Sequence, residues 1–208
     1  MNYKFLDIAS TPSVRAAQVA NGSREMWEQF KGHRTFDRFT DDEVAFITAR
    51  DSFYMATVSE SGWPYIQHRG GPPGFLKVLD EKTLGFADFR GNLQYISVGN
   101  VAADDRAALI LVDYPSRARL KILAHVEVRD IAGDTELEGR LTLPVYKGKP
   151  ERVFLLHLET FDWNCPQHIT PRFTLAEIDA AVSPLRTRIA ELEAENQALR
   201  AQKNAHAR

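Results

Sequence analysis

The sequence predicts a mainly β protein of the α+β class, in which an antiparallel sheet carries flanking helices and a long C-terminal helix. Four short runs between residues 53 and 89 are rich in β-forming residues and are separated by Gly, Pro and Asp turn signals. Residues 119–129 alternate apolar and polar side chains, as a half-buried strand does. After Pro184 the composition shifts to Ala, Glu, Arg and Leu, which favours a helix. A chain of 208 residues, 44% of them hydrophobic, suits one domain with appendages.

The first half of the predicted sheet is an antiparallel meander. Its strands are expected at residues 53–59, 64–69, 75–79 and 84–89. The Gly- and Pro-rich segment 70–74 breaks the ladder between the second and third of these strands. Polar and cationic side chains interrupt the apolar pattern, and these are Gln67, His68, Arg69, Lys77 and Arg90. A sheet stabilised only by its core does not need cations at such positions, whereas a sheet that binds an anionic ligand does.

The second half of the sheet is predicted from three further runs. Residues 107–113 form a continuous apolar run and are expected to be a buried strand. Residues 119–129 place Leu120 and every second residue after it on one face. Residues 153–161 are expected to form the last strand. Between the halves, residues 91–102 are predicted to start as a loop and become helical, whereas residues 139–143 fit no pattern clearly.

Helices are predicted before the sheet. Residues 13–30 read as a helix that residues 21–23 can split, and we expect this arm to pack on the domain. Contact of Ser23 or Arg24 with a phosphate is the alternative. Thr40 and Glu43 form a capping box at the start of a helix over residues 41–49.

The C-terminal segment begins with a second capping box, made by Thr174 and Glu177. Apolar residues then follow a 4-3-4-3 spacing from Leu185 to Leu199, with Asn196 at an a position. This pattern is typical of a parallel two-stranded coiled coil. Two heptads are too few to dimerise alone, but tethering to an existing dimer raises their effective concentration. An amphipathic helix packed on its own domain is the alternative.

Bulk properties exclude several classes of function. The net charge of −2 gives no basic field that would attract nucleic acid, and no basic region precedes Asn196 as in a DNA-binding zipper. No apolar run approaches the ~20 residues of a membrane span. The N-terminus lacks the apolar stretch of a signal peptide, and Cys165 is the only cysteine, so we expect a cytoplasmic protein.

Metal and thiol chemistry find little support in the sequence. His125, His157, Cys165 and His168 lack compact metal-ligand spacing, so we expect no metal. Cys165 lies near His168, but no further group that would orient a base is visible. Cys165 is therefore interpreted as a structural residue.

The order of motifs resembles the FMN-binding split-barrel family of pyridoxamine 5′-phosphate oxidase. The matching segments are residues 62–64, Arg69, 76–80, 85–88, 99–100 and 119–121, within a region covering residues 36–175. Residues 68–75 and 162–168 look like an uncharacterised subgroup rather than the vitamin B6 oxidase itself. The resemblance implies a six-stranded antiparallel split β-barrel at residues 36–175, after a helical arm at 1–35 and before the C-terminal helix at 176–208.

The resemblance also implies a cofactor and its site. FMN needs cations for its phosphate, hydrogen-bonding groups for its ribityl chain, and backbone or amide groups at its ring edge. By resemblance, Arg69, Lys77, Arg90 and Asn92 fall near the phosphate and ribityl chain, and Phe86, Ala87 and Asp88 fall beside the ring. Arg119 and Lys121 share one face of a later strand. The ring edge would be contacted by Gln67 and by Trp163, Asn164 and Gln167. The last three residues can come from the other subunit.

Three departures from the family pattern limit what the resemblance implies. The usual Ser-Arg-Lys after the fourth strand is replaced by residues 89–92, so the phosphate has fewer cations or takes them from elsewhere. The insert at residues 70–74 is absent from the vitamin B6 oxidase pattern. The Arg-x-His pair that holds pyridoxal phosphate there has no clear counterpart, so the substrate does not transfer.

The leading hypothesis is an FMN-dependent oxidoreductase that acts as a homodimer, with the flavin at the subunit interface and an electron donor such as NAD(P)H. His68, beside Arg69, is a candidate to hydrogen-bond the flavin or to serve as a catalytic proton donor, and a partly buried structural histidine is the alternative. A non-catalytic flavin or haem protein used for storage or sensing is the second hypothesis. The third is an interaction protein with a vestigial barrel, whose C-terminal helix recruits a partner.

Overall fold

The computed structural model describes residues 3–30, 32, 34–131, 134–141, 143 and 150–206. The chain divides into two units, each treated by itself below. The first comprises Met1–Asp113 and Ala118–Gln167, and it contains the sheet. The second comprises Tyr114–Arg117 and His168–Arg208, and it contains the C-terminal helix.

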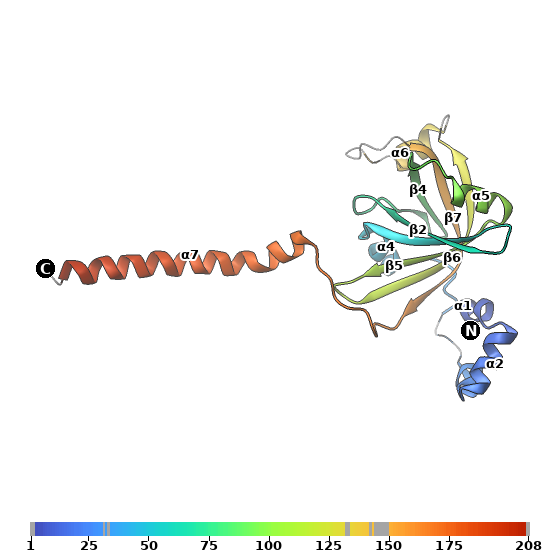
Figure 1. The fold of residues 1–208 in the computed structure, drawn as a ribbon, viewed down its shortest axis with the longest axis horizontal. Helices are drawn as coiled ribbons and strands as arrows, with labels where there is room; N and C mark the ends of the chain where they lie inside the picture. The colour runs from blue at the N-terminus through green and yellow to red at the C-terminus, as the bar shows by residue number, and fades with distance from the viewer. Residues whose placement is uncertain are drawn as a thin grey trace. The chain divides into compact units, whose positions relative to one another are not determined.

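An antiparallel sheet of seven strands forms the first unit (Figure 1). The strands are β1 Ser52–Val58, β2 Pro64–Gly70, β3 Lys77–Asp80, β4 Thr83–Phe89, β5 Arg106–Asp113, β6 Ala118–Asp130 and β7 Pro150–Asn164. Each corresponds to one run predicted from the sequence. The predicted mainly β split-barrel class is confirmed, with seven strands in place of the six that the resemblance implied.

The strand order β2-β1-β5-β6-β7-β4-β3 corrects the predicted meander. The β1–β2 and β3–β4 hairpins both form, but they lie at opposite ends of the sheet. The link between them buries Phe75 and Leu76, which are 3% and 0% exposed. Because these side chains enter the core, the segment carries the chain from one edge of the sheet to the other. Local turn signals show where a ladder breaks but not which strand it joins next.

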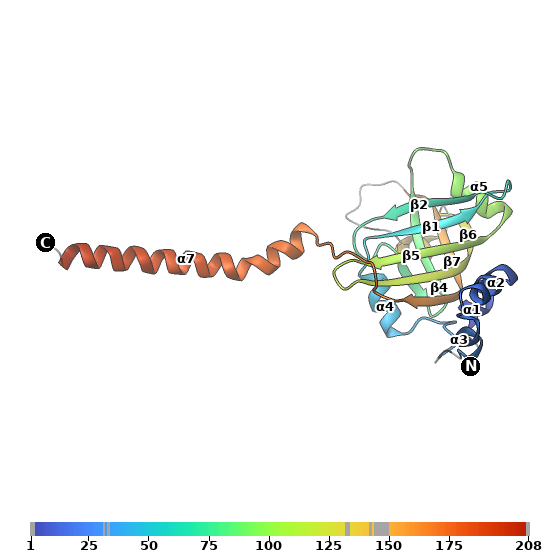
Figure 2. The same ribbon diagram turned by 60° about the horizontal axis from the view of Figure 1, so that its bottom comes forward.

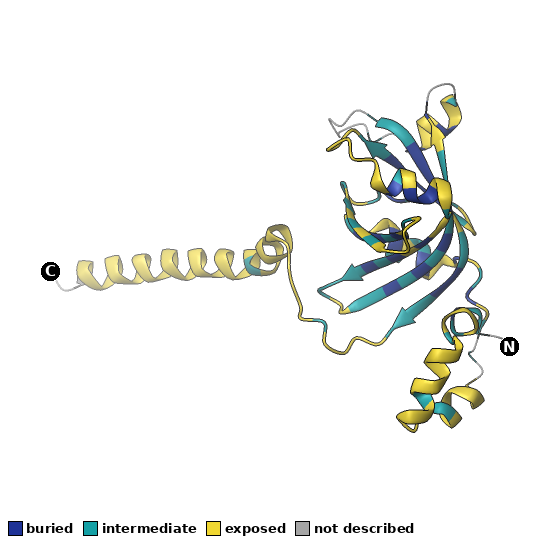
Figure 3. Ribbon diagram, turned by 45° about the vertical axis from the view of Figure 1, so that its right-hand side comes forward, coloured by how far each residue is buried: buried dark blue, intermediate teal, exposed yellow. Residues whose placement is uncertain are grey.

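The sheet curls so that its two ends share one core (Figure 2, Figure 3). Phe53 of β1 lies edge-on to Phe86 of β4, with ring centroids 5.5 Å apart. Phe86 in turn stacks on Phe154 of β7 at 5.1 Å. Along β6 the residues Leu120 to Val126 alternate between buried and half-buried, so one face lines this core and the other faces outward. The Phe53–Phe86 contact therefore connects two strands that share no backbone hydrogen bonds, whereas Phe86 and Phe154 are opposite each other in the β4–β7 ladder.

Six of the described helices accompany the sheet in the first unit. They are α1 Lys4–Ala9, α2 Pro12–Ala20, α3 Arg24–Gln29, α4 Asp41–Thr48, α5 Ile96–Ala103 and α6 Thr135–Leu141. The predicted split of the N-terminal helix is confirmed, because Gly22 adopts a φ of 69° between α2 and α3. Helix α1 was not predicted, and α6 occupies most of the segment that fitted no pattern.

The N-terminal arm is attached to the outer side of β6 and β7, as its predicted packing requires. The hydroxyl of Tyr3 donates a hydrogen bond to Asp162, and Lys4 forms an ion pair with Glu159 at 3.0 Å. Lys121 pairs with Asp162 at 2.6 Å and lies 4.6 Å from the centroid of the Phe5 ring.

The capping box before α4 is confirmed and has a further role. The Glu43 carboxylate accepts hydrogen bonds from the backbone N–H and hydroxyl of Thr40 at 3.0 and 2.8 Å. Arg34 donates to it at 2.5 Å, and the indole N–H of Trp163 at 2.7 Å. Glu43 is 1% exposed, so this carboxylate is a buried junction between α4 and the end of β7.

In the second unit, α7 extends over Leu175–His206 as one helix with Pro184 inside it. Its predicted capping box is present, since Glu177 accepts hydrogen bonds from the backbone N–H and hydroxyl of Thr174 at 2.7 and 2.8 Å. No helix in the described part of the chain is long and apolar enough to span a bilayer.

Candidate functional site

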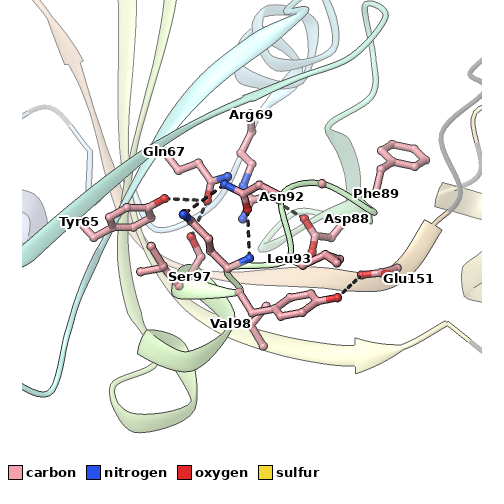
Figure 4. Close-up of a pocket in the computed structure, with 14 residues that line it drawn as sticks. Tyr65, Gln67, Arg69, Asp88, Phe89, Asn92, Leu93, Ser97, Val98 and Glu151 are labelled. Carbon is pink, nitrogen blue, oxygen red and sulfur yellow. Dashed lines mark hydrogen bonds and ion pairs between the residues drawn. The ribbon is translucent and has the colours of Figure 1, made fainter.

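A cavity of about 230 Å³ lies between β2, the end of β4 and the loop that leads into α5 (Figure 4). The lining residues are Tyr65, Gln67 and Arg69 of β2, Asp88 and Phe89 of β4, residues 91–98, and Glu151 of β7. The cavity therefore joins one edge strand to two strands from the other end of the sheet. Four of its polar lining residues, Gln67, Arg69, Asp88 and Asn92, are among those assigned to one ligand site from the sequence.

The alternation of β2 sets the direction of its three lining residues. Tyr65, Gln67 and Arg69 are half-buried and share one face, whereas His68 lies on the exposed opposite face. His68 packs edge-on against Tyr54 of β1, with ring centroids 5.3 Å apart. The proposed proton donor is thus on the other side of the strand from the cavity.

The loop before α5 has an unusual backbone. Leu93 and Tyr95 adopt φ angles of 64° and 51°, in the left-handed region that non-glycine residues seldom occupy. The Asn92 side chain helps to hold this conformation, because its carbonyl oxygen accepts a hydrogen bond from the backbone N–H of Gln94 at 3.1 Å. Such residues gather at ligand sites, where the surrounding structure compensates the strain.

Arg69 is the cation at the centre of the cavity wall. Its Nη1 atom lies 2.6 Å from Oδ1 of Asp88. The guanidinium lies over the rings of Phe86 and Phe154, at 5.6 and 5.2 Å from their centroids. Its Nε atom is buried and has no hydrogen-bond partner among the described residues. An orphaned buried donor beside a polar cavity is the kind of group that a ligand can satisfy.

Asp88 is held between two guanidinium groups. Besides Arg69, the Arg152 side chain approaches Asp88 to 4.0 Å. Burial nevertheless raises the pKa of Asp88 above its ordinary value, because the loss of hydration outweighs the attraction of both arginines.

Neutral hydrogen-bonding groups line the α5 side of the cavity. Ser97 donates to Oε1 of Gln67 at 3.0 Å, and Tyr65 donates to the same oxygen at 3.5 Å. One turn further, Asn100 donates to Thr57 at 2.9 Å, with both side chains buried. These bonds connect α5 to β2 and β1 at the floor of the cavity.

The β7 side of the cavity carries a second cluster of charges. Glu151 accepts a hydrogen bond from the Tyr95 hydroxyl at 3.2 Å and pairs with Arg152 at 2.9 Å. Arg152 also lies over the Tyr95 ring, at 4.6 Å from its centroid. Arg90 is exposed and reaches Glu151 at 3.8 Å.

The structure brings four of the residues predicted from the sequence into this cavity, namely Gln67, Arg69, Asp88 and Asn92. The ring of Phe86 packs against the guanidinium of Arg69. Ala87, the next residue in β4, is buried. Arg90 does not line the cavity, but its side chain reaches the lining residue Glu151 at the rim. Lys77 begins β3, outside the cavity lining.

The remaining predicted residues lie on or after the paired strands β6 and β7. Arg119 is opposite Asn164, and Lys121 is opposite Asp162, with which it pairs. The Trp163 indole is engaged by Glu43 and packs against Phe46. Gln167 is exposed after the end of β7. None of these residues lines the cavity of this one chain.

Sequence reasoning missed Tyr65, Tyr95, Ser97, Glu151 and Arg152. Tyr65 could have been found, because it alternates in phase with Gln67 and Arg69. Arg152 enters the site through its pairing with Asp88 across β7 and β4, which no local pattern reveals. Within the described residues, no three His, Cys, Asp or Glu side chains gather as metal ligands.

The part of the chain that contains this cavity matches a known protein family. The family model described as pyridoxamine 5′-phosphate oxidase matches residues 39–155, more than half of the chain. The chain belongs to the pyridoxamine 5′-phosphate oxidase family. The matched region includes β1 to β6 and every residue that lines the cavity. The family match therefore covers the lining of the cavity, strands β1 to β6 and the start of β7.

Solved structures of similar fold come from several bacteria. A Lactobacillus delbrueckii protein assigned provisionally as a pyridoxamine 5′-phosphate oxidase is 22% identical, with a TM-score of 0.48, over 61% of this chain and 94% of its own. HupZ of Group A Streptococcus is 16% identical, with a TM-score of 0.45, over 65% and 100%. An FMN-binding protein of Syntrophomonas wolfei is 14% identical, with a TM-score of 0.43, over 71% and 97%. No curated protein matches the chain.

Proposed function

We propose that this member of the pyridoxamine 5′-phosphate oxidase family is a flavoprotein that binds FMN and acts as an oxidoreductase. The observation that carries the proposal is the buried Nε atom of Arg69, which lacks a partner at the wall of a polar cavity. A phosphorylated ligand would satisfy this donor and use the charge of the guanidinium.

The residues present suit the parts of FMN. Arg69 supplies a cation for the phosphate, and Arg152 lies close enough to hold Asp88 if Arg69 turns toward the ligand. Gln67, Ser97 and Asn92 offer amide and hydroxyl groups of the kind that a ribityl chain uses. When bound, the flavin would supply the redox chemistry, and this chain would bind and orient it. NAD(P)H is the electron donor we propose.

The flavin site is proposed to be completed by a second copy of the chain. The cavity volume of about 230 Å³ is below the roughly 300–1,000 Å³ of typical cofactor sites. The outward face of β1, β2, β5 and β6 carries an apolar groove of about 470 Å³, lined in part by Ala56, Val58, Pro64, Ala108 and Leu123. Exposed apolar surface of this kind is typical of an interface.

A dimer through this outer face would give His68 and the β6–β7 residues a role. His68, Arg119 and Lys121 are on the outward side of their strands, so they reach a flavin only if it is shared between two chains. Asn164, opposite Arg119, and the exposed Gln167 would approach the ring edge in the same way, whereas Trp163 is on the inward face with Leu120 and is bonded to Glu43. The proposed site thus has an Arg69 half and a half contributed across the interface.

The test is the absorption spectrum of the purified protein, followed by mass identification of whatever denaturation releases. We expect a flavin spectrum and FMN, and oxidation of NADH or NADPH by the loaded protein. Arg69→Ala is expected to weaken FMN binding at least ten-fold, whereas Arg38→Ala, at an exposed arginine outside both the cavity and the groove, is the matched control. Equal affinity in wild type and both variants would disprove the assignment of the phosphate to Arg69.

A further inference from the structure

We propose that α7 pairs with α7 of a second copy of this chain as a parallel, in-register, two-stranded coiled coil. This assembly is independent of the flavin and goes beyond the function proposed above. It rests on the heptad pattern, the exposure of the apolar stripe and the order of charges beside that stripe.

The heptad pattern is longer than the part that follows Pro184. From Leu175 to Leu199 every core position is spaced by three or four residues without a break. The a positions are Leu175, Val182, Ile189 and Asn196, and the d positions are Ile178, Leu185, Leu192 and Leu199. This run of more than three heptads reaches the length at which a coiled coil is indicated.

Almost all of α7 is exposed in the single chain (Figure 3), and within the stripe only Val182 is half-buried. Leu185 is 64% exposed, Ile189 56%, Leu192 46% and Leu199 57%. Burying such a continuous apolar stripe is the main force that pairs helices.

The residue types select two parallel strands. Val182 and Ile189 are β-branched residues at a, and d carries Leu in three of its four positions, a combination that favours dimers. In a parallel, in-register pair the two Asn196 side chains face each other and can hydrogen-bond. In an antiparallel pair Asn196 would lie against an apolar d residue. A buried amide without a partner is costly, so Asn196 favours the parallel form.

The flanking charges select the register. In a parallel pair each g residue faces the e residue five positions further along the other helix. Arg188 then faces Glu193, and Glu195 faces Arg200, so both contacts are attractive. A slip of one heptad in either direction places Arg188 opposite an arginine, at position 186 or 200. Alternating charge along one face is thus matched to a second copy of the same helix.

Pro184 does not interrupt this surface. It lies at a c position, on the side of the helix away from the a and d stripe. Helix α7 continues through it. Residues 165–174 connect β7 to α7, and a chain of that length can extend by about 33 Å. A connection of this length allows the α7 helices of two chains to pair, and the pairing does not depend on how the two sheets contact each other.

The test is disulfide trapping in the full chain with Cys165→Ser as background. Leu199→Cys is at d and is expected to cross-link to itself under mild oxidation at least ten-fold faster than Ala201→Cys, at an outward f position. Equal rates would overturn the coiled coil. Poor self-trapping of Leu199→Cys together with efficient trapping between Leu199→Cys and Val182→Cys would indicate an antiparallel pair and would overturn the parallel arrangement.

Two further variants separate the coil from the flavin site. Leu192→Lys places charges in the seam and should abolish trapping at position 199 while FMN binding stays unchanged. Glu193→Arg should slow trapping, and adding Arg188→Glu should restore it, since the reversed pair is again attractive; absence of rescue contradicts the register. A protein that traps at position 199 but binds no flavin would refute the proposed function and leave this inference standing.

Discussion

Glu43 shows how one buried carboxylate can organise segments that are far apart in sequence. It caps α4 through Thr40, receives Arg34 from the preceding loop, and receives the indole of Trp163 from the end of β7. Burial alone would raise the pKa of Glu43, but the hydrogen bonds from Trp163, Thr40 and Arg34 outweigh it and hold the pKa below its usual range. The carboxylate is therefore charged in the folded protein.

This lowered pKa gives a testable dependence of stability on pH. Because the folded state binds the Glu43 proton more weakly than the unfolded chain, the stabilisation is fully present above the ordinary pKa of Glu, about 4.3, and is lost as pH falls through the folded value. Glu43→Gln should lower the free energy of unfolding at pH 7 by about 2 kcal/mol. Urea titrations from pH 3 to 7 should show this difference shrinking in acid. The exposed Glu60→Gln serves as control, and a difference constant with pH would contradict the argument.

The pKa of Asp88 is shifted in the opposite direction from that of Glu43, and this shift gives a prediction for FMN binding. Its carboxylate would repel a phosphate at Arg69, so Asp88→Asn should tighten FMN binding by about ten-fold, or ~1.4 kcal/mol. Because burial raises the pKa of Asp88, its negative charge develops as pH rises through values above the ordinary range of Asp. The advantage of the Asn variant over wild type should therefore grow with pH across that window, measured by flavin fluorescence. A loss of affinity like that of Arg69→Ala would instead mean that Asp88 positions Arg69.

The residue types of the site could be predicted from the sequence better than its geometry. Arg69, Gln67, Asp88 and Asn92 stand out because polar groups interrupt β-forming runs, and the cavity brings all four together. His68 looked equivalent to its neighbours because single-residue patterns do not say which face of an edge strand is inside. That choice depends on the curl of the sheet.

The same limit holds for the elements. Each strand was predicted close to its observed bounds, because alternation and turn residues are local signals. The pairing of β1 with β5 and of β4 with β7 was missed, because it depends on Phe75 and Leu76 entering the core. Pairing between distant strands is a property of the whole core rather than of any window.

Helix α1 is an element that tertiary contacts stabilise. With six residues it is too short to be stable alone. Burial and then the bond to Asp162 raise the pKa of Tyr3, so its hydroxyl remains a donor. Tyr3→Phe should lower the free energy of unfolding by about 1 kcal/mol, since Asp162 keeps only Lys121.

The ion pair between Lys4 and Glu159 holds the same arm, so the cost of removing it can be compared with the cost of Tyr3→Phe. Lys4→Ala removes the half-exposed pair with Glu159 and should cost less, about 0.5 kcal/mol. Urea unfolding measures both variants, and limited proteolysis within residues 3–30 reports release of the arm. An effect of Lys4→Ala larger than that of Tyr3→Phe would mean that charge, rather than the buried hydroxyl, holds α1 on the sheet.

At the scale of the molecule, one chain carries two surfaces that we propose to bind a second copy. The apolar groove on β1, β2, β5 and β6 would share the flavin, and α7 would form the coil. Each contact holds the other at high effective concentration, so either alone can maintain a dimer. Loss of either contact is then hidden in a measurement of mass, and only loss of the groove contact is expected to show in a measurement of flavin binding.

A double variant therefore tests the whole assembly. Val58→Lys places a charge in the groove at a side chain 39% exposed, and Val14→Lys on α2, at 40%, is the matched control. Val58→Lys should lose FMN at least ten-fold while light scattering still reports a dimer, because α7 holds the chains together. Leu192→Lys should keep both flavin and dimer. Only the two changes combined should give a monomer, because a lysine opposes burial in both seams. A monomer from Val58→Lys alone would mean that α7 does not pair, and full flavin affinity in the monomeric double variant would place the whole cofactor site within one chain.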